Sequence, residues 1–160
     1  MQDRELIKLV RQIKTSIKPG VTISTAESCT GGMLAACLTA ISGSSEYFST
    51  GIVSYSNMAK MKLLSVKEKT LRKFGAVSEE VATEMAEGSR KVAESNIAVS
   101  ITGIAGPDGG TVQKPVGMVC FGLASSGSVE SFTHYFTGNR AEVRMRACLV
   151  ALQLVLSEVV

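Results

Sequence analysis

The chain has 160 residues, of which 45% are hydrophobic, and this content suits one domain with a complete core and excludes a disordered protein. A net charge of +3 without any run of five basic residues argues against nucleic-acid binding. The charged N-terminus lacks a signal peptide's apolar core and no stretch approaches the ~18 apolar residues of a membrane span, so we expect a single cytoplasmic domain over residues 1–160 without a membrane partner.

The first half of the chain alternates between helical and strand patterns. Apolar residues at helical spacing predict an amphipathic helix over 4–18, which ends before a Pro-Gly pair. An alternating run predicts a strand over 21–26, and a small-residue and apolar run predicts a helix over 30–41. The segments that follow are a loop at 43–45, a strand over 51–55, a helix over 57–64 with Asn57 as its N-cap, and a short helical piece over 65–74.

The second half continues this alternation and closes with a hairpin. The predicted elements are a helix over 78–94, a strand over 97–101, a glycine-rich loop over 103–110, two strands over 116–123 and 129–136, and a final helix to about Val160. A short serine-rich link between the last two strands favours an antiparallel hairpin, and Asn139 with Glu142 predicts a capping box for the final helix. The expected fold is therefore α/β, a three-layer α/β/α sandwich with a mixed β-sheet.

Cysteine and histidine give little sign of metal or redox chemistry. Four cysteines without C-x-x-C spacing are expected to be reduced, and only Cys29, beside Ser28, is placed to be reactive. The single histidine, His134, shares strand parity with Phe132 and Phe136, which favours a structural role. We therefore expect no metal and no cofactor.

Residues 26–32 form a strand, polar turn and glycine pair before a helix. This layout places backbone N–H groups at a helix N-terminus, where a Ser28 hydroxyl would have donors beside it for a developing oxyanion. The alternative is that Ser28 or Thr30 only caps the helix, while Gly31 and Gly32 permit the turn. These seven residues alone favour the capping interpretation.

A serine nucleophile needs a base, and lysine is the available residue type. Lys60 follows a predicted strand end, whereas Lys62 lies about 200° further around a helix and should face elsewhere. A lysine accepts a proton near neutral pH only if its pKa falls from ~10.4 to roughly 7–8. The alternative is that Lys60 is an ordinary surface lysine.

Two further segments are candidates for ligand contacts. The loop after Thr102 and Gly103 is rich in glycine but lacks the P-loop order, so a plain loop remains the alternative to a ligand site. Arg140 and Arg144 share one helix face and suit a phosphate, although two solvent-exposed arginines would look the same. Glu27 is a candidate to orient a polar substrate group or to pair with one of these bases.

Together these segments closely resemble the C-terminal domain of the competence/damage-inducible protein CinA, a family that includes stand-alone nicotinamide mononucleotide deamidases. The resemblance spans residues from about 5 to 158. It rests on Ala-Glu-Ser-Cys-Thr-Gly-Gly (26–32), Gly-Ser-Ser (43–45), Tyr-Ser-Asn-x-Ala-Lys (55–60), Gly-Ala-Val-Ser-Glu-Glu-Val (75–81), Thr-Gly-Ile-Ala-Gly-Pro-Asp-Gly-Gly (102–110), Lys-Pro-Val-Gly (114–117) and Gly-Asn-Arg (138–140). Asn139 stands where the family often has Asp, a difference that concerns helix capping.

The resemblance implies a metal-free amidohydrolase that converts nicotinamide mononucleotide to nicotinic acid mononucleotide and ammonia. Ser28 matches the family's nucleophile and Lys60 its base. Tyr55 matches a residue that supports catalysis. The resemblance and the patterns above together predict that the substrate is bound by Glu27, Thr30, Gly31, Gly32, Thr102, Gly103 and Arg140 or Arg144.

Two other functions stay open at this point. The domain could be a non-catalytic nucleotide-binding or regulatory module associated with competence or DNA damage, as the family name suggests, or an amidase that uses the Cys29 thiol. The resemblance, with an apolar final helix, also predicts a homodimer or higher homo-oligomer.

Overall fold

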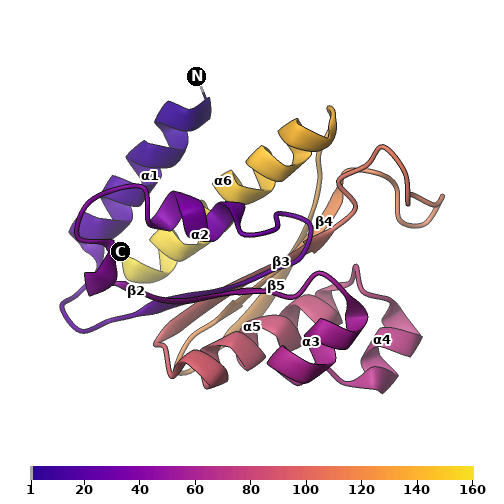
Figure 1. Cartoon of the computed structure of the whole chain (residues 1–160), viewed down its shortest axis with the longest axis horizontal. Coiled ribbons are helices and arrows are strands. Elements are labelled where there is room, and N and C mark those ends of the chain that lie inside the picture. The colour runs from indigo at the N-terminus through magenta and orange to yellow at the C-terminus, as the bar shows by residue number, and fades with distance from the viewer. Residues whose placement is uncertain (1) are drawn as a thin grey trace.

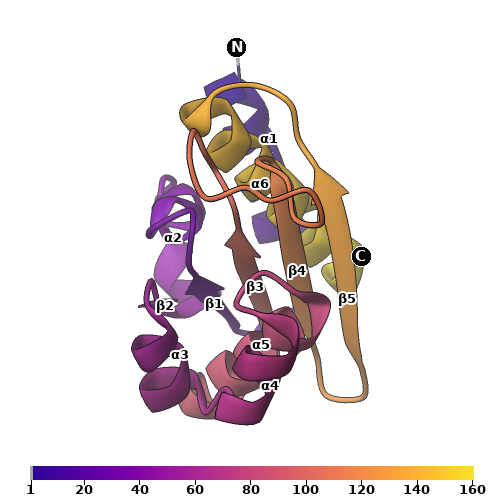
Figure 2. The same cartoon turned by 90° about the vertical axis from the view of Figure 1, so that its right-hand side faces the viewer.

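The computed structural model describes residues 2–160, with side chains from residue 4 onward. Five strands form one mixed sheet in the order β2-β1-β3-β4-β5, seen in sequence across Figure 2. β1 pairs in parallel with both β2 and β3, while β3, β4 and β5 pair antiparallel. The strands are β1 (Ile23–Glu27), β2 (Phe48–Val53), β3 (Ile97–Gly103), β4 (Met118–Ala124) and β5 (Val129–Tyr135).

Helices cover both faces of the sheet, which confirms the three-layer α/β/α prediction (Figure 1). One face carries α1 (Gln2–Ser16), α2 (Met33–Leu38) and α6 (Arg140–Val159), and the other carries α3 (Asn57–Leu64), α4 (Glu68–Phe74) and α5 (Glu79–Ala93). The larger hydrophobic cluster lies under α1, α2 and α6, and a smaller one, built around Ala26, Leu64 and Met85, lies under α3–α5. No helix of the described residues is long and apolar enough to cross a membrane.

Several element boundaries differ from the sequence-based expectation. β2 begins at Phe48 rather than at residue 51, and α2 is shorter than the predicted helix over 30–41. The 3₁₀ helix η1 (Ser44–Glu46) occupies the expected loop. The N-cap of α3 is Ser56, whose hydroxyl accepts from the amide of Ala59, so the assignment to Asn57 was wrong by one residue.

Other local predictions are confirmed. The capping box opens α6, because the Asn139 side chain accepts from the Glu142 amide while the Glu142 carboxylate accepts from the Asn139 amide. β4 and β5 pair as the expected antiparallel hairpin.

Candidate active site

Sheet topology brings three chain segments together at one edge. β1, β2 and β3 are parallel, so the residues that follow all three strands lie at the same end of the sheet. The chain leaves β1 for α2 on one face and leaves β2 for α3 on the other (Figure 1). Such a divergence opens a crevice at the carboxyl ends of the strands, where α/β proteins commonly bind ligands.

Ser28 and Lys60 meet in this region. Ser28 directly follows β1, and its amide donates to the carbonyl of Ile101 at 2.9 Å, which ties the turn to β3. The Lys60 side chain reaches from α3, with Nζ 3.0 Å from Ser28 Oγ and 2.9 Å from the carbonyl oxygen of Ser54. The two residues are 32 positions apart in sequence, and both are buried.

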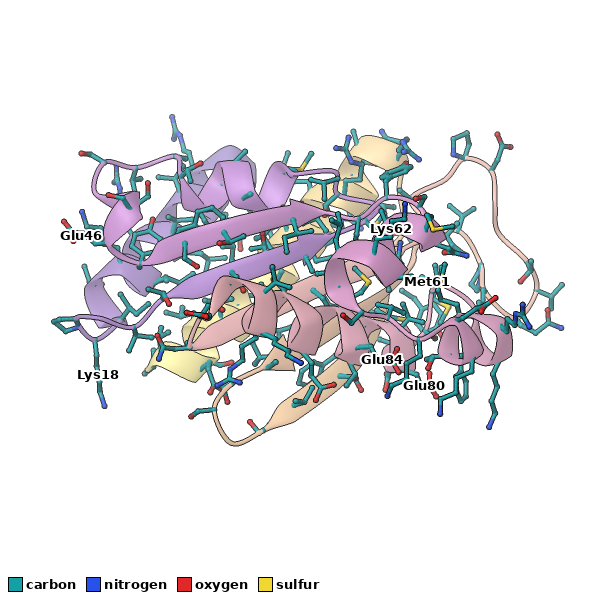
Figure 3. All side chains as sticks on the ribbon, turned by 60° about the horizontal axis from the view of Figure 1, so that its bottom comes forward. Lys18, Glu46, Met61, Lys62, Glu80 and Glu84 are labelled. Atoms are coloured by element: carbon teal, nitrogen blue, oxygen red, sulfur yellow. The ribbon has the colours of Figure 1, made fainter. Side chains whose placement is uncertain are left out.

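The packing of α3 directs Lys60 inward. Leu64, one turn further along, is buried against α5, where Gly88 comes so close that an added Cβ would lie 2.0 Å from the Leu64 carbonyl oxygen. Lys62 lies on another side of α3 and is exposed, as Figure 3 shows. The expectation that these two lysines face different environments is therefore confirmed.

Burial changes the acid–base properties of Lys60. Its side chain is 1% exposed, and neither ion pair formed by the described residues includes it. The loss of hydration disfavours the ammonium form, and burial accordingly lowers the pKa of Lys60 to about 8. This lysine can therefore accept a proton near neutral pH.

The carboxylate of Glu27 occupies the N-terminus of α2. It accepts from the amides of Gly32 at 3.0 Å, Leu34 at 3.0 Å and Ala35 at 2.8 Å, and it is 1% exposed. A carboxylate at this position satisfies the unpaired helix amides and the helix dipole together. This arrangement corrects two expectations: Glu27 pairs with neither arginine, and the amide of Gly32 does not face an open site.

Most amides of the turn donate to other residues. The Gly31 amide donates to the Ser28 carbonyl at 3.0 Å, and the Met33 amide donates to the Thr30 carbonyl at 3.2 Å. Within residues 28–35, only the N–H groups of Cys29 and Thr30 donate to no other residue. The Thr30 hydroxyl is also buried without a partner.

Arg140 and Arg144 reach different segments although they are one helical turn apart. Arg140 donates to the Gly106 carbonyl at 2.8 Å and to the Tyr55 hydroxyl at 2.9 Å, and both Arg140 and Tyr55 are exposed. Arg144 is half-buried and donates to the carbonyls of Cys29 at 3.1 Å and Thr30 at 2.8 Å. The sequence left their roles unresolved, and the structure separates them.

Comparison with known proteins assigns the family. The CinA C-terminal domain model matches residues 7–159. The chain belongs to this family. It is 49% identical over 155 residues to the nicotinamide-nucleotide amidohydrolase PncC of Escherichia coli K12, covering 96% of this chain and 94% of that protein.

Longer relatives and a solved structure agree with this assignment. A CinA-like protein of Endomicrobium trichonymphae is 56% identical over 133 residues, and the chain spans about a third of the length of such relatives. The structure of the competence/damage inducible protein CihA from Agrobacterium tumefaciens aligns with a TM-score of 0.92 at 42% identity, covering 96% of this chain and 94% of that one.

The remaining candidates of this CinA C-terminal domain lie outside the Ser28–Lys60 contact. Thr102 is 1% exposed and its hydroxyl donates to the Ala76 carbonyl at 2.8 Å, so it already has a structural partner. Gly103 permits close strand packing, because an added Cβ would lie 2.8 Å from the Val119 side chain. A contact of Thr102 and Gly103 with a ligand stays a prediction.

Cysteine and histidine have structural surroundings. Cys29 is buried, and burial raises the pKa of its thiol to about 11, which opposes formation of a thiolate. His134 stacks on Phe136 and meets Phe121 edge-on, as expected for a structural histidine. No cluster of three potential metal ligands occurs among the described residues.

Proposed function

We propose that this chain hydrolyses the carboxamide of nicotinamide mononucleotide, with Ser28 as nucleophile and Lys60 as general base. The observation that carries the proposal is the 3.0 Å contact between Lys60 Nζ and Ser28 Oγ, made by a buried lysine whose pKa is lowered to about 8. The PncC relatives, which match over nearly the whole chain, are named for the same substrate class.

The lowered pKa decides whether Lys60 can act as a base. A lysine with a pKa of ~10.4 would be neutral in roughly one molecule in 2,500 at pH 7. With a pKa of about 8, roughly one molecule in ten carries the neutral amine. The Ser54 carbonyl accepts one N–H of that amine, leaving the lone pair available to the Ser28 proton.

The reaction then proceeds through an acyl-enzyme. Lys60 takes the Ser28 proton as Oγ attacks the carboxamide carbon, and the C=O electron pair moves onto oxygen. Collapse of this intermediate breaks the C–N bond, and Lys60 returns the proton to the departing ammonia. Water attacks the Ser28 ester with Lys60 again as base, which releases the carboxylate product and restores both residues.

The amides of Cys29 and Thr30 are the donors that we assign to the oxyanion, because neither donates to another residue whereas those of Gly31 and Gly32 do. For the substrate phosphate we assign Arg140, which is exposed beside Tyr55 at the same edge of the sheet. A guanidinium suits a phosphate because it offers paired donors with a permanent charge. Arg140→Ala should therefore raise KM more than it lowers kcat.

The test is ammonia release from nicotinamide mononucleotide by the parent protein and by Ser28→Ala and Lys60→Ala. We expect turnover by the parent and a loss of several orders of magnitude in both variants, each with an unchanged circular dichroism spectrum. Cys29→Ser should retain activity. Full activity in Ser28→Ala would refute the assignment, and a parent without turnover would favour the binding-module alternative.

A further inference from the structure

One side chain outside the Ser28–Lys60 pair contacts the backbone that follows the nucleophile. Arg144 donates through Nε to the Cys29 carbonyl at 3.1 Å and through a terminal nitrogen to the Thr30 carbonyl at 2.8 Å. The two acceptors are consecutive carbonyls, 114 and 115 positions away in sequence. A single guanidinium thus holds two successive peptide units of the turn.

Planarity of the peptide bond gives this contact a directional consequence. The carbonyl of Cys29 and the N–H of Thr30 belong to one trans peptide unit and point in opposite directions. Arg144 comes from α6, on the opposite face of the sheet from α3 and Lys60 (Figure 1). Holding the Cys29 carbonyl toward α6 therefore turns the Thr30 N–H away from α6, toward the face that supplies Lys60.

The second carbonyl reinforces the same geometry. Thr30 shares its carbonyl with the peptide unit of Gly31, whose N–H donates back to the Ser28 carbonyl at 3.0 Å. Gly31 has a φ of 60°, which glycine adopts at little energetic cost. Because glycine also reaches many other backbone conformations, steric restriction adds little rigidity to this turn. Charge-assisted hydrogen bonds from Arg144 supply an external restraint that local backbone sterics do not.

We infer that Arg144 is a positioning residue that orients the Cys29–Thr30 peptide unit so that the Thr30 N–H serves as an oxyanion donor. The inference rests on the proposed function. It gives Arg140 and Arg144 different roles: Arg140 acts on the bound ligand, whereas Arg144 acts through the backbone beside Ser28. Loss of Arg144 should consequently affect the transition state and leave ground-state binding intact.

The first test compares Arg144→Ala, Arg144→Lys and Arg146→Ala in the ammonia assay. Removing an oxyanion donor costs about 10²–10³ in kcat, and we expect Arg144→Ala to approach the lower figure with KM unchanged. Arg144→Lys keeps the charge but cannot hold two carbonyls with one planar fork, so its loss should be smaller. Among the described residues Arg146, on the same helix, donates only to Thr137, so Arg146→Ala serves as the matched control with unchanged kcat and KM.

A binding measurement distinguishes positioning from ligand contact. In a Ser28→Ala background, the Kd for nicotinamide mononucleotide by calorimetry should be the same with Arg144 or Ala at this position. A weakened Kd, or a raised KM with kcat unchanged, would overturn the inference and make Arg144 a ligand-binding residue. If Arg144→Ala lowers the melting temperature of the protein, the Kd measurement is repeated with Arg144→Lys in the same Ser28→Ala background, where an unchanged Kd is again expected.

Labelling of Ser28 by a fluorophosphonate separates this inference from the proposed substrate. In that reaction Ser28 Oγ bonds to phosphorus, fluoride leaves, and Lys60 takes the hydroxyl proton. The phosphoryl oxygen requires the same donor as an oxyanion, so Arg144→Ala should slow labelling, measured by mass spectrometry, by about tenfold or more. Slowed labelling beside a parent that releases no ammonia would support the inference while rejecting the amide substrate. Labelling of Arg144→Ala at the parent rate would overturn the inference.

Discussion

Replacement of Lys60 by Met should abolish turnover and remove a pH-dependent cost to folding. Lys60 is 1% exposed, and its pKa in the folded protein is lowered to about 8, against ~10.4 in an unfolded chain. Between these values the unfolded chain binds more protons than the folded one, so the parent gains stability as pH rises. Below pH 8 the folded protein loses the full amount of stability that this pKa difference represents, because Lys60 must either be buried as an ammonium or release its proton on folding.

The pKa difference sets the magnitude. A difference of about 2.4 pKa units corresponds to about 3 kcal/mol at pH 7, and the cost falls below about 1 kcal/mol at pH 10. Met has a similar length and no charge, but it leaves the Ser54 carbonyl and the Ser28 hydroxyl without their partner, at a cost of about 1–3 kcal/mol. This second cost does not depend on pH and cancels when two pH values are compared.

Urea unfolding of the parent and Lys60→Met at pH 7 and pH 10 measures the difference. The unfolding free energy of the parent should rise by about 2–3 kcal/mol from pH 7 to pH 10 relative to that of the variant, which lacks the titrating lysine. Lys62→Met, an exposed position on the same helix, should show no such change. A parent–variant difference that stays constant between the two pH values would refute the lowered pKa and with it the role of Lys60 as base.

Three further predictions follow from the same contacts. The kcat/KM of the parent should rise about tenfold per pH unit below 8 and level off above it, because neutral Lys60 is the reactive form; a flat profile from pH 6 to 9 would contradict this. Glu27→Gln should lower the unfolding free energy by about 2–3 kcal/mol in urea titrations, against less than about 0.5 for exposed Glu46→Gln, whose position Figure 3 shows. Gly88→Ala should cost about 2 kcal/mol by the same measurement despite its better helix propensity, because the added methyl overlaps the Leu64 carbonyl; equal stability would indicate that α3 and α5 separate easily.

The sequence predicted the layers and most elements because their patterns are local. The capping box at Asn139 and the hairpin between β4 and β5 are determined by residues close together in sequence, and both are present in the structure. The predicted strand over 51–55 begins three residues late and ends two residues late relative to β2, an edge strand that contains serine, threonine and glycine and alternates between half-buried and exposed positions. The Asn57 prediction failed because Ser56 and Asn57 are both good N-caps and only the backbone decides between them.

The candidate site was predictable only in its residue types. Sequence patterns and the family resemblance pointed to Ser28 and Lys60, but the burial of Lys60 depends on α5 and could not be read from the helix over 57–64. The carbonyls of Ser54, Cys29 and Thr30 bind Lys60 and Arg144, and a backbone acceptor leaves no signal in a sequence. Arg140 and Arg144 are the same residue type on one helix face, so their different hydrogen-bond partners could not be predicted from the sequence either.

The position of Glu27 explains why the turn after β1 needs support from α6. A strand, polar turn and glycine pair before a helix predicts a row of free amides, but the Glu27 carboxylate, beside the proposed nucleophile Ser28, accepts from three of them. The N–H groups that donate to no other residue, those of Cys29 and Thr30, precede α2 in a turn that α2 holds through one hydrogen bond, from the Met33 amide to the Thr30 carbonyl. Arg144 contacts the carbonyls of these two residues. One buried carboxylate thus stabilises the helix and leaves, as proposed oxyanion donors, only the amides closest to Ser28, where a distant arginine contacts the backbone.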